Sequence, residues 1–219
     1  GLDIAKLIKK FTKILPFIKF RNLCLYLSQF RLVRKCILFS VIFNLNLNII
    51  MTTIRMFWGS STEMTSLASE LVQEKIQAYG HQVDSFDVRD GLDQLSNYKN
   101  IIIGCPTWNV GELQDDWDML FEDYKKFSFD GVIGAFFGVG DQYGYSCNYL
   151  DAVGLLARPF IEKGGKLIGK WSIEGYEFDE SVAQEGDEFL GLALDYDNQD
   201  ELSEERITKW TDSIQSEFN

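Results

Sequence analysis

Histidine and cysteine, on which much enzyme chemistry depends, are scarce in this sequence. The single histidine, His81, stands at the start of an expected strand and away from the polar loops, so we expect a surface position rather than a catalytic one. The four cysteines show no CxxC spacing and are too few for a secreted disulfide scaffold. No catalytic or metal-ligating residue is therefore expected, and a reducing, cytoplasmic compartment is the simpler interpretation.

Residues 1–50 contain no apolar run long enough to cross a bilayer. Their longest apolar stretch, from Cys36 to Phe43, is far shorter than the roughly 20 residues of a spanning helix, and three asparagines interrupt the sequence after it. Basic and apolar parts alternate, and no small-residue cleavage site precedes Met51, so a signal peptide is not favoured. We expect the protein to contact a membrane only if residues 1–50 bind to it.

Basic residues are scarce after Met51. Residues 1–50 hold nine Lys or Arg and one acid, out of 21 and 33 in the 219 residues, which leaves 12 bases and 32 acids for residues 51–219. A net charge near −20 there repels nucleic acid and anionic membranes and favours partners with basic faces. We therefore expect a basic, apolar extension over residues 1–50, outside the fold, and one domain over residues 51–219. The extension is either translated sequence upstream of a start at Met51 or an anchor or targeting segment.

Strand and helix patterns alternate after Met51. Short apolar or β-branched runs predict strands over residues 54–58, 83–88, 100–105, 132–139 and 166–173. Apolar residues at helical spacing predict helices over residues 67–79, 113–124, 150–161 and 202–218, the last begun by Ser203. This alternation predicts a doubly wound α/β fold with a five-stranded parallel sheet and helices on both faces. Residues 176–200 are interpreted as an insertion in or beside the fifth strand.

Three unusual loops follow the first, third and fourth strands, where ligands bind in such folds. The first places Ser60, Ser61, Thr62 and Thr65 at a helix N-terminus, where backbone N–H groups and hydroxyls can hold a phosphate or merely cap the helix. The second puts Trp108 at the tip of a strand-to-helix turn, and the third, residues 138–145, combines glycines with two tyrosines. Together the loops are typical of a phosphate seat with two aromatic walls.

These segments resemble the long-chain flavodoxins. The resemblance rests on GSSTEMT, GCPTWNVGELQDDWD, GVGDQYGYSCNYLDAVG, EGYEFDES, FLGLALDYDNQ and LSEERITKWTDSIQSEF, and it covers essentially all of residues 51–219. It implies strand order 2-1-3-4-5, with residues 176–200 as the long-chain insertion. The family has glycine where this chain has Glu63, which places an acid near a dianion. The second flavodoxin of enteric bacteria is similar here, so the change is interpreted as a subfamily trait.

The resemblance implies non-covalently bound flavin mononucleotide (FMN) and a role for each loop. The phosphate is expected on the first loop, the two flavin faces against Trp108 and Tyr145, and the ring edges along the second and third loops. In the family, the peptide corresponding to Asn109–Val110 turns its carbonyl toward flavin N5 after the first electron. The expected cofactor-binding residues are Ser60, Ser61, Thr62, Glu63, Met64, Thr65, Pro106, Thr107, Trp108, Asn109, Val110, Gly111, Gly140, Asp141, Tyr145 and Asp197.

The function implied is that of a low-potential one-electron carrier, not an enzyme. It would be a monomer that moves electrons from a basic-faced partner, such as an NADPH-dependent flavoprotein reductase, to acceptor enzymes, and that binds no nucleic acid. Docking is expected on one acidic helix that follows the Trp108 loop and carries Glu112, Asp115, Asp116, Asp118, Glu122 and Asp123.

Three other classes of protein compete with this interpretation. A response-regulator receiver shares the strand order but needs an aspartate at the end of the third strand, where this chain has Cys105. A flavin-dependent reductase needs a second substrate pocket, usually at a dimer interface, which the insertion does not obviously supply. A binding module without redox function would purify without colour.

Overall fold

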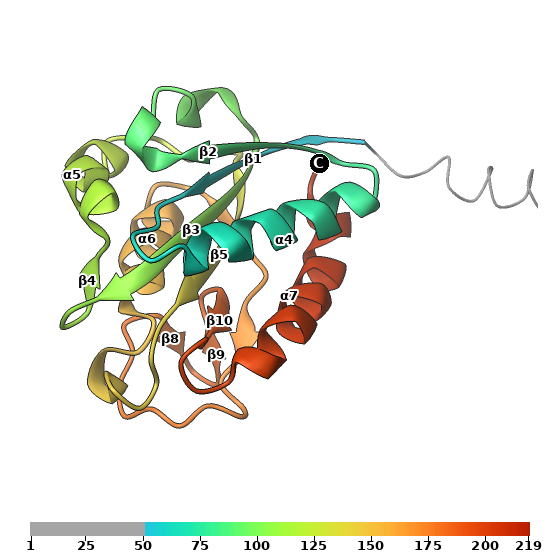
Figure 1. Ribbon diagram of the computed structural model, residues 1–219. Coiled ribbons are helices and arrows are strands. Elements are labelled where there is room, and N and C mark those ends of the chain that lie inside the picture. The colour runs from blue at the N-terminus through green and yellow to red at the C-terminus, as the bar shows by residue number, and fades with distance from the viewer. Residues whose placement is uncertain (1–50) are drawn as a thin grey trace, which may run out of the picture. The chain divides into compact units, whose positions relative to one another are not determined.

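A parallel sheet runs through residues 51–219, the part of the chain that the computed structural model describes (Figure 1). Its strands are β1 (Thr53–Trp58), β2 (Gln82–Asp87), β3 (Asn100–Trp108), β5 (Ile133–Val139) and β10 (Leu192–Leu194), in the order β10-β5-β3-β1-β2. This confirms the predicted parallel sheet and its strand order. The extension predicted over residues 1–50 lies outside the described residues.

Two short strands share the fifth position of the sheet. β6 (Lys166–Ile168) pairs with residues 133–135 of β5, and β10 pairs with residues 137–139 of the same strand. The prediction of one strand over residues 166–173 was therefore wrong in its second half. The chain leaves the sheet at Gly169, whose φ of +72° favours glycine, and whose Cβ would lie 2.6 Å from Trp210 Nε1.

An antiparallel sheet fills the interval between β6 and β10. It consists of β7 (Trp171–Ser172), β8 (Gln184–Glu185) and β9 (Glu188–Phe189), in the order β7-β9-β8. The insertion at strand five is confirmed, but it occupies residues 169–191 rather than 176–200. Its rings from Tyr176, Phe178 and Phe189 pack on Tyr149, with centroid distances of 5.8, 5.6 and 5.7 Å, so it braces the segment that follows β5.

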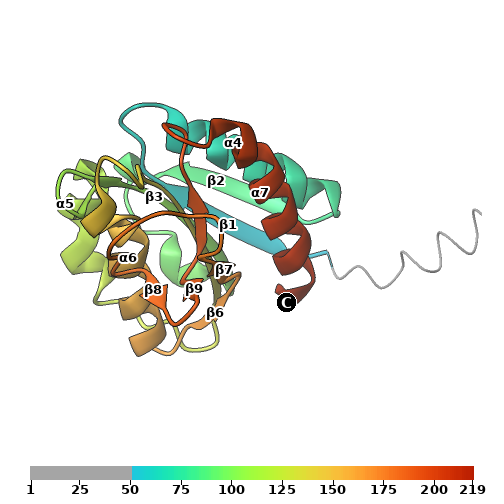
Figure 2. The ribbon, with the colours of Figure 1, turned by 90° about the horizontal axis from the view of Figure 1, so that it is seen from below.

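Helices cover both faces of the parallel sheet, as the sequence predicted. α4 (Met64–Ala78) and α7 (Asp200–Ile214) lie on one face, and α5 (Asp115–Tyr124) and α6 (Asp151–Glu162) lie on the other (Figures 1 and 2). The strands alternate between the two cores: Ile102 faces α4 and α7, whereas Ile101 and Ile103 face α5 and α6. The described residues also form four short 3₁₀ helices, which are η3 (Val88–Asp90), η4 (Leu95–Asn97), η5 (Ser146–Asn148) and η6 (Gln215–Glu217).

Two helices differ from their predicted form. α4 begins at Met64, three residues before the predicted start, and it buries Ala68, Val72 and Ile76, while Leu67 is 52% exposed. Its predicted end is confirmed, since Gly80 has φ +94° and donates its N–H to Gln77. α7 begins at Asp200, two residues before the predicted start at residue 202. No helix in residues 51–219 combines the length and the apolar character that a bilayer crossing demands.

His81 is buried, so the prediction of a surface position was wrong. Only 6% of the residue is exposed, and its ring lies 6.5 Å from that of Phe218. The residues after α7 return to the amino edge of the sheet, where Asn219 pairs with Asn100 at the start of β3. This contact lies at the amino edge of the sheet, away from the loops that follow the strands.

Candidate cofactor site

The three polar loops meet at one edge of the parallel sheet. β1 pairs with β3 up to Trp58 opposite Gly104, and β3 pairs with β5 up to Pro106 opposite Val139. Because the strands are parallel and adjacent, the segments that leave β1, β3 and β5 emerge side by side (Figure 1).

The first loop ends at the N-terminus of a helix whose N-cap side chain makes no hydrogen bond to the first turn. This helix is α4, which begins at Met64, and its N-cap residue is Glu63. Ser60 Oγ is buried and has no hydrogen-bond partner within residues 51–219. Thr62, Glu63 and Met64 are exposed and Thr65 is buried. Unpaired donors at a helix N-terminus, beside a free hydroxyl, are suited to an anion.

Gln114 holds the first loop against the start of α5. Its buried side chain is the N-cap of α5, where Oε1 accepts from the N–H of Trp117, and its Nε2 donates to Ser61 Oγ at 3.3 Å. Gly59 makes this approach possible, because a Cβ there would lie 2.4 Å from Gln114 Oε1. Sequence reasoning missed Gln114; its position directly before an acidic helical turn is the signal that marks an N-cap.

The second loop is the tip of a β-hairpin rather than a strand-to-helix turn. β3 continues to Trp108, three residues beyond its predicted end at Cys105, and pairs with β4 (Glu112–Leu113). Pro106 is consequently buried inside the strand. The turn at residues 109–111 has positive φ at Asn109 (+47°) and Gly111 (+83°). The helix predicted from residue 113 begins at Asp115, so Glu112 belongs to the hairpin, where it accepts a 2.6 Å hydrogen bond from Asn109.

The hairpin rests on the first turn of α6. Thr107 Oγ1 accepts the backbone N–H of Ala152 at 3.1 Å, and a Cβ on Gly111 would lie 2.4 Å from Asp151 Oδ2. Asp151 is 4% exposed and accepts from Asn148 Nδ2 and from the N–H of Val182 in the insertion. One buried carboxylate therefore lies close to the second loop and bonds both η5, which follows the third loop, and the insertion.

The third loop is organised by the carboxylate of Asp141. Its Oδ1 accepts the backbone N–H groups of Tyr143 (3.1 Å) and Gly144 (2.7 Å) and the side-chain amide of Asn198 (2.8 Å). Desolvation alone would raise the pKa of Asp141, but the bonds from Gly144, Asn198 and Tyr143 together hold it below its usual value. The ionised form is the one that accepts these three hydrogen bonds, which support the turn of the loop.

Asp195, which sequence reasoning missed, ties the third loop to the segment between β10 and α7. It is fully buried and accepts from the backbone and side chain of Gln142 at 3.1 and 2.7 Å, and from the N–H groups of Asp197 and Asn198. The N–H of Gly140 also donates a hydrogen bond to the carbonyl of Leu194, the last residue of β10, at 3.0 Å. The signal in the sequence was an Asp-x-Asp-Asn run directly after an apolar strand.

The expected site residues thus lie at one edge of the sheet, with Pro106, Thr107 and Trp108 in the last part of β3. Asp197 is exposed at this edge, where desolvation and then the charges of Asp141 and Asp195 raise its pKa. The side chain of Trp108 is half-buried, whereas Tyr145 is 52% and Val110 is 75% exposed. Cys105, at the position where a receiver needs its aspartate, is fully buried, and burial raises the pKa of its thiol to about 12.

An open α/β sheet with its polar loops gathered at the carboxyl edge is the arrangement of the doubly wound, mononucleotide-binding class. A family model described as Flavodoxin matches residues 56–210 of the chain. A flavodoxin of Nostoc sp. is 41% identical over 171 residues, which cover 75% of this chain and 96% of that protein. Flavodoxin 2 of Escherichia coli is 39% identical over 166 residues, which cover 74% of this chain and 95% of that protein.

Solved structures agree with the sequence relatives. A Fusobacterium nucleatum flavodoxin crystallised with flavin mononucleotide has a TM-score of 0.73 and 29% identity, and the match covers 76% of this chain and 99% of that one. The chain belongs to the flavodoxin family, which confirms the resemblance found in the sequence. It is an electron-transfer flavoprotein rather than an enzyme.

Proposed function

We propose that the three loops bind FMN non-covalently and that the protein shuttles electrons between a reductase and acceptor redox enzymes. The observation that carries the cofactor assignment is the buried, unpartnered hydroxyl of Ser60 beside the start of α4. A buried hydroxyl without a partner costs free energy, and a phosphate oxygen would supply the missing acceptor. The residues present therefore fit the phosphate end of FMN.

The phosphate would lie on Ser60, Ser61, Thr62, Glu63, Met64 and Thr65. Backbone N–H groups and the helix dipole can hold a dianion without a nearby Lys or Arg. Gln114 fixes the orientation of the Ser61 hydroxyl through its 3.3 Å hydrogen bond. Glu63 works against the binding, because its carboxylate stands at the same helix end.

The flavin ring would lie between Trp108 and Tyr145. Aromatic side chains that cover a flat ring gain more than their area burial alone, by about 1 kcal/mol for each pair. Thr107, Asn109, Val110 and Gly111 would line one edge of the ring, and Gly140 with Asp141 the other. Asp197 would stand near the ribityl chain, and Asp195 would fix that side of the site through Gln142 and Asn198.

FMN, when bound, accepts and returns electrons one at a time. The residues of this chain bind it, orient it and set the charge around it. Asn109 and Val110 are exposed in the hairpin turn, which supports a carbonyl of their peptide that turns toward flavin N5. The 32 acids of residues 51–219 disfavour additional negative charge on the flavin and so lower the potential of the second electron.

We further propose that a basic-faced reductase docks on the acidic start of α5, next to the hairpin. Asp115 and Asp118 are exposed and enter no ion pair described for residues 51–219, whereas Glu122 and Asp123 are paired with Lys125 and Lys126. The charge available for steering is therefore concentrated in the first turn of α5, closest to the hairpin. The free thiols of Cys105 and Cys147 suit the reducing, cytoplasmic location proposed for the monomer.

A titration with two flavins tests the cofactor assignment. Apoprotein should bind FMN much more tightly than riboflavin, which lacks the phosphate, and Ser60→Ala should weaken FMN binding about tenfold with little effect on riboflavin. Ser203→Ala is the matched control, because it removes another buried, unpartnered hydroxyl, on α7. Equal affinity for the two flavins would show that the phosphate does not bind at the start of α4.

A further inference from the structure

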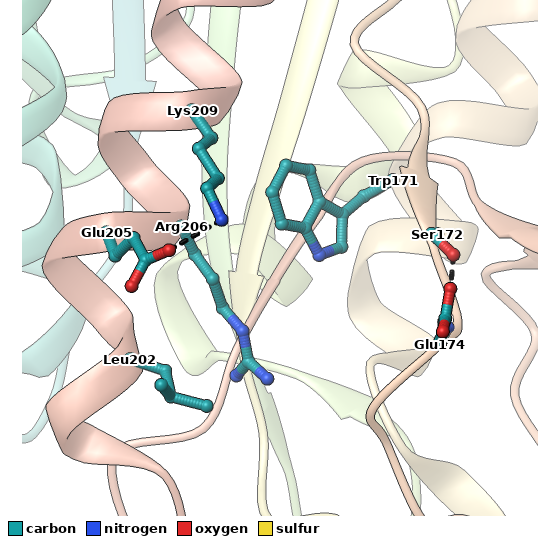
Figure 3. A pocket seen from close by; sticks show the side chains of 7 residues that line it. All are labelled: Trp171, Ser172, Glu174, Leu202, Glu205, Arg206 and Lys209. Carbon is teal, nitrogen blue, oxygen red and sulfur yellow. Dashed lines mark hydrogen bonds and ion pairs between the residues drawn. The ribbon is translucent and has the colours of Figure 1, made fainter.

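A hollow of about 260 Å³ lies between α7 and the insertion, outside the proposed FMN site (Figure 3). None of the residues that line it belongs to the three loops at the carboxyl edge of β1, β3 and β5. They come from β7, from the turn after it, and from one face of α7: Trp171, Ser172, Glu174, Leu202, Glu205, Arg206 and Lys209.

Arg206 brings a buried positive charge to this hollow. The residue is 8% exposed, its guanidinium carbon lies 4.2 Å from the centre of the Tyr176 ring, and Nη2 donates to Gln199 Oε1 at 2.6 Å. Nη1 is buried and has no hydrogen-bond partner within the described residues 51–219. A guanidinium cannot lose its charge, so a donor left unpaired at low exposure calls for an acceptor.

Arg206 is the cation of the hollow that enters no ion pair within residues 51–219. Lys209 is paired with Glu205 at 2.5 Å, and Ser172 Oγ accepts the backbone N–H of Glu174 at 3.1 Å. Trp171 faces Arg206 across the hollow (Figure 3). Its Nε1 already donates a hydrogen bond to the hydroxyl of Tyr176. Trp171 therefore offers an apolar surface, as does Leu202 on α7.

We propose that this hollow is a second ligand site, which binds a small monocarboxylate with a flat, apolar body. The carboxylate would accept from Arg206 Nη1, and the body would lie against Trp171 and Leu202. The volume exceeds the roughly 30 Å³ of a single water and falls just below the 300 Å³ at which drug-sized pockets begin. Glu174 and Glu205 on the rim favour one negative charge over two, because each additional charge adds repulsion.

Benzoate is a suitable probe, with neutral benzamide and inorganic phosphate as comparisons. Each would be titrated into the full chain with saturating FMN, so that the start of α4 is not available to an anion, and the titration would be repeated without FMN. The readout is the indole N–H signal of Trp171 in a nitrogen-correlated proton spectrum, with that of Trp117 in the opposite core as internal control. Benzoate should shift the Trp171 signal saturably, with a Kd on the order of 1 mM, and benzamide should bind at least tenfold more weakly.

Two variants link the binding to the hollow. Arg206→Met keeps the aliphatic stem and should weaken benzoate binding about tenfold. Arg158→Met is the matched control, because Arg158 also anchors the insertion, through the carbonyls of Val182 and Gln184, but does not line the hollow. If Arg206→Met does not fold, Ser172→Phe should fill the hollow from its exposed rim and abolish binding.

The inference is overturned by any of three results. One is equal binding of benzoate and benzamide, and another is binding of phosphate in preference to benzoate. The third is a Trp171 signal that does not respond to benzoate in the wild-type chain.

Discussion

The side-chain nitrogen of Gln114 lies 3.3 Å from the hydroxyl oxygen of Ser61, and this contact joins the first loop to the acidic helix. The same Nε2 atom donates to Asp116 at 2.6 Å, so Asp116 is connected to the proposed phosphate seat through a single side chain. Asp115 and Asp118, in contrast, are exposed. A charge change made to test docking should therefore avoid Asp116, because it would also disturb the first loop.

Reversing the charge of Asp115 and Asp118 should slow electron transfer from a basic flavoprotein reductase. We expect the second-order rate at low salt to fall about tenfold, and the difference to shrink at high salt, where the Debye length falls below about 8 Å. Stopped-flow measurements of Asp115→Lys with Asp118→Lys, at increasing ionic strength, test this. FMN affinity should be nearly unchanged.

The control for the charge reversal carries the same net change elsewhere. Glu74 and Glu162 are exposed and lie toward the C-terminal ends of α4 and α6, which face the amino edge of the sheet. Glu74→Lys with Glu162→Lys should leave the rate at low salt much closer to the wild type. Equal slowing by both double variants would mean that net charge acts without a specific docking face.

Replacing Glu63 by glycine should stabilise the apoprotein and tighten FMN binding. Glu63 has φ +68°, a left-handed conformation that costs a residue with a Cβ about 1 kcal/mol relative to glycine. Urea unfolding of the apoprotein should show a gain of that order, and FMN titration should show a several-fold lower Kd. Glu63→Gln separates the two effects, because it removes the charge and keeps the strain; it should tighten FMN binding without a gain in stability. Weaker binding by both variants would show that the carboxylate assists the phosphate.

Removal of either proposed aromatic wall should weaken FMN binding. Trp108→Ala and Tyr145→Ala should each raise the Kd of FMN by roughly fivefold or more, because an aromatic contact contributes about 1 kcal/mol beyond its area. Tyr143→Ala is the matched control, since Tyr143 lies in the same loop and is 56% exposed, against 52% for Tyr145. If the two tyrosine variants bind FMN equally well, Tyr145 is not a wall of the site.

A chain that lacks residues 1–50 should fold and bind FMN. Within the described residues, every strand of the parallel sheet and every helix that covers it begins after Met51, and the family match spans residues 56–210. The truncated protein should purify yellow, with the thermal stability of the full chain. A colourless or insoluble product would show that the domain boundary at Met51 is wrong.

The sheet and the site edge could be predicted because both follow from local patterns. Unbroken apolar runs such as Ile101 to Ile103 mark buried parallel strands, and loops after such strands must share an edge. The split fifth strand was not visible, because Trp171 and Ile173 continue the apolar pattern of β6 although the chain turns at Gly169. Periodicity cannot tell a strand of the main sheet from one of the insertion.

The residues that sequence reasoning missed act over long distances along the chain. Gln114 contacts Ser61, 53 residues away, and Asp195 contacts Gln142 across the same interval. His81 is buried by a C-terminal segment that the strand pattern does not place. Such contacts depend on the tertiary fold, whereas the loops that they support are recognisable from their own residues.

Stepwise reduction of the purified full chain, followed by its absorption spectrum, tests the central claim most directly. The account predicts a yellow protein with one FMN per chain, whose flavin takes up its two electrons in separate steps, the second at low potential. A chain that is colourless and binds no added FMN, or a flavin that takes both electrons in a single step, would contradict the assignment of this protein as a one-electron carrier.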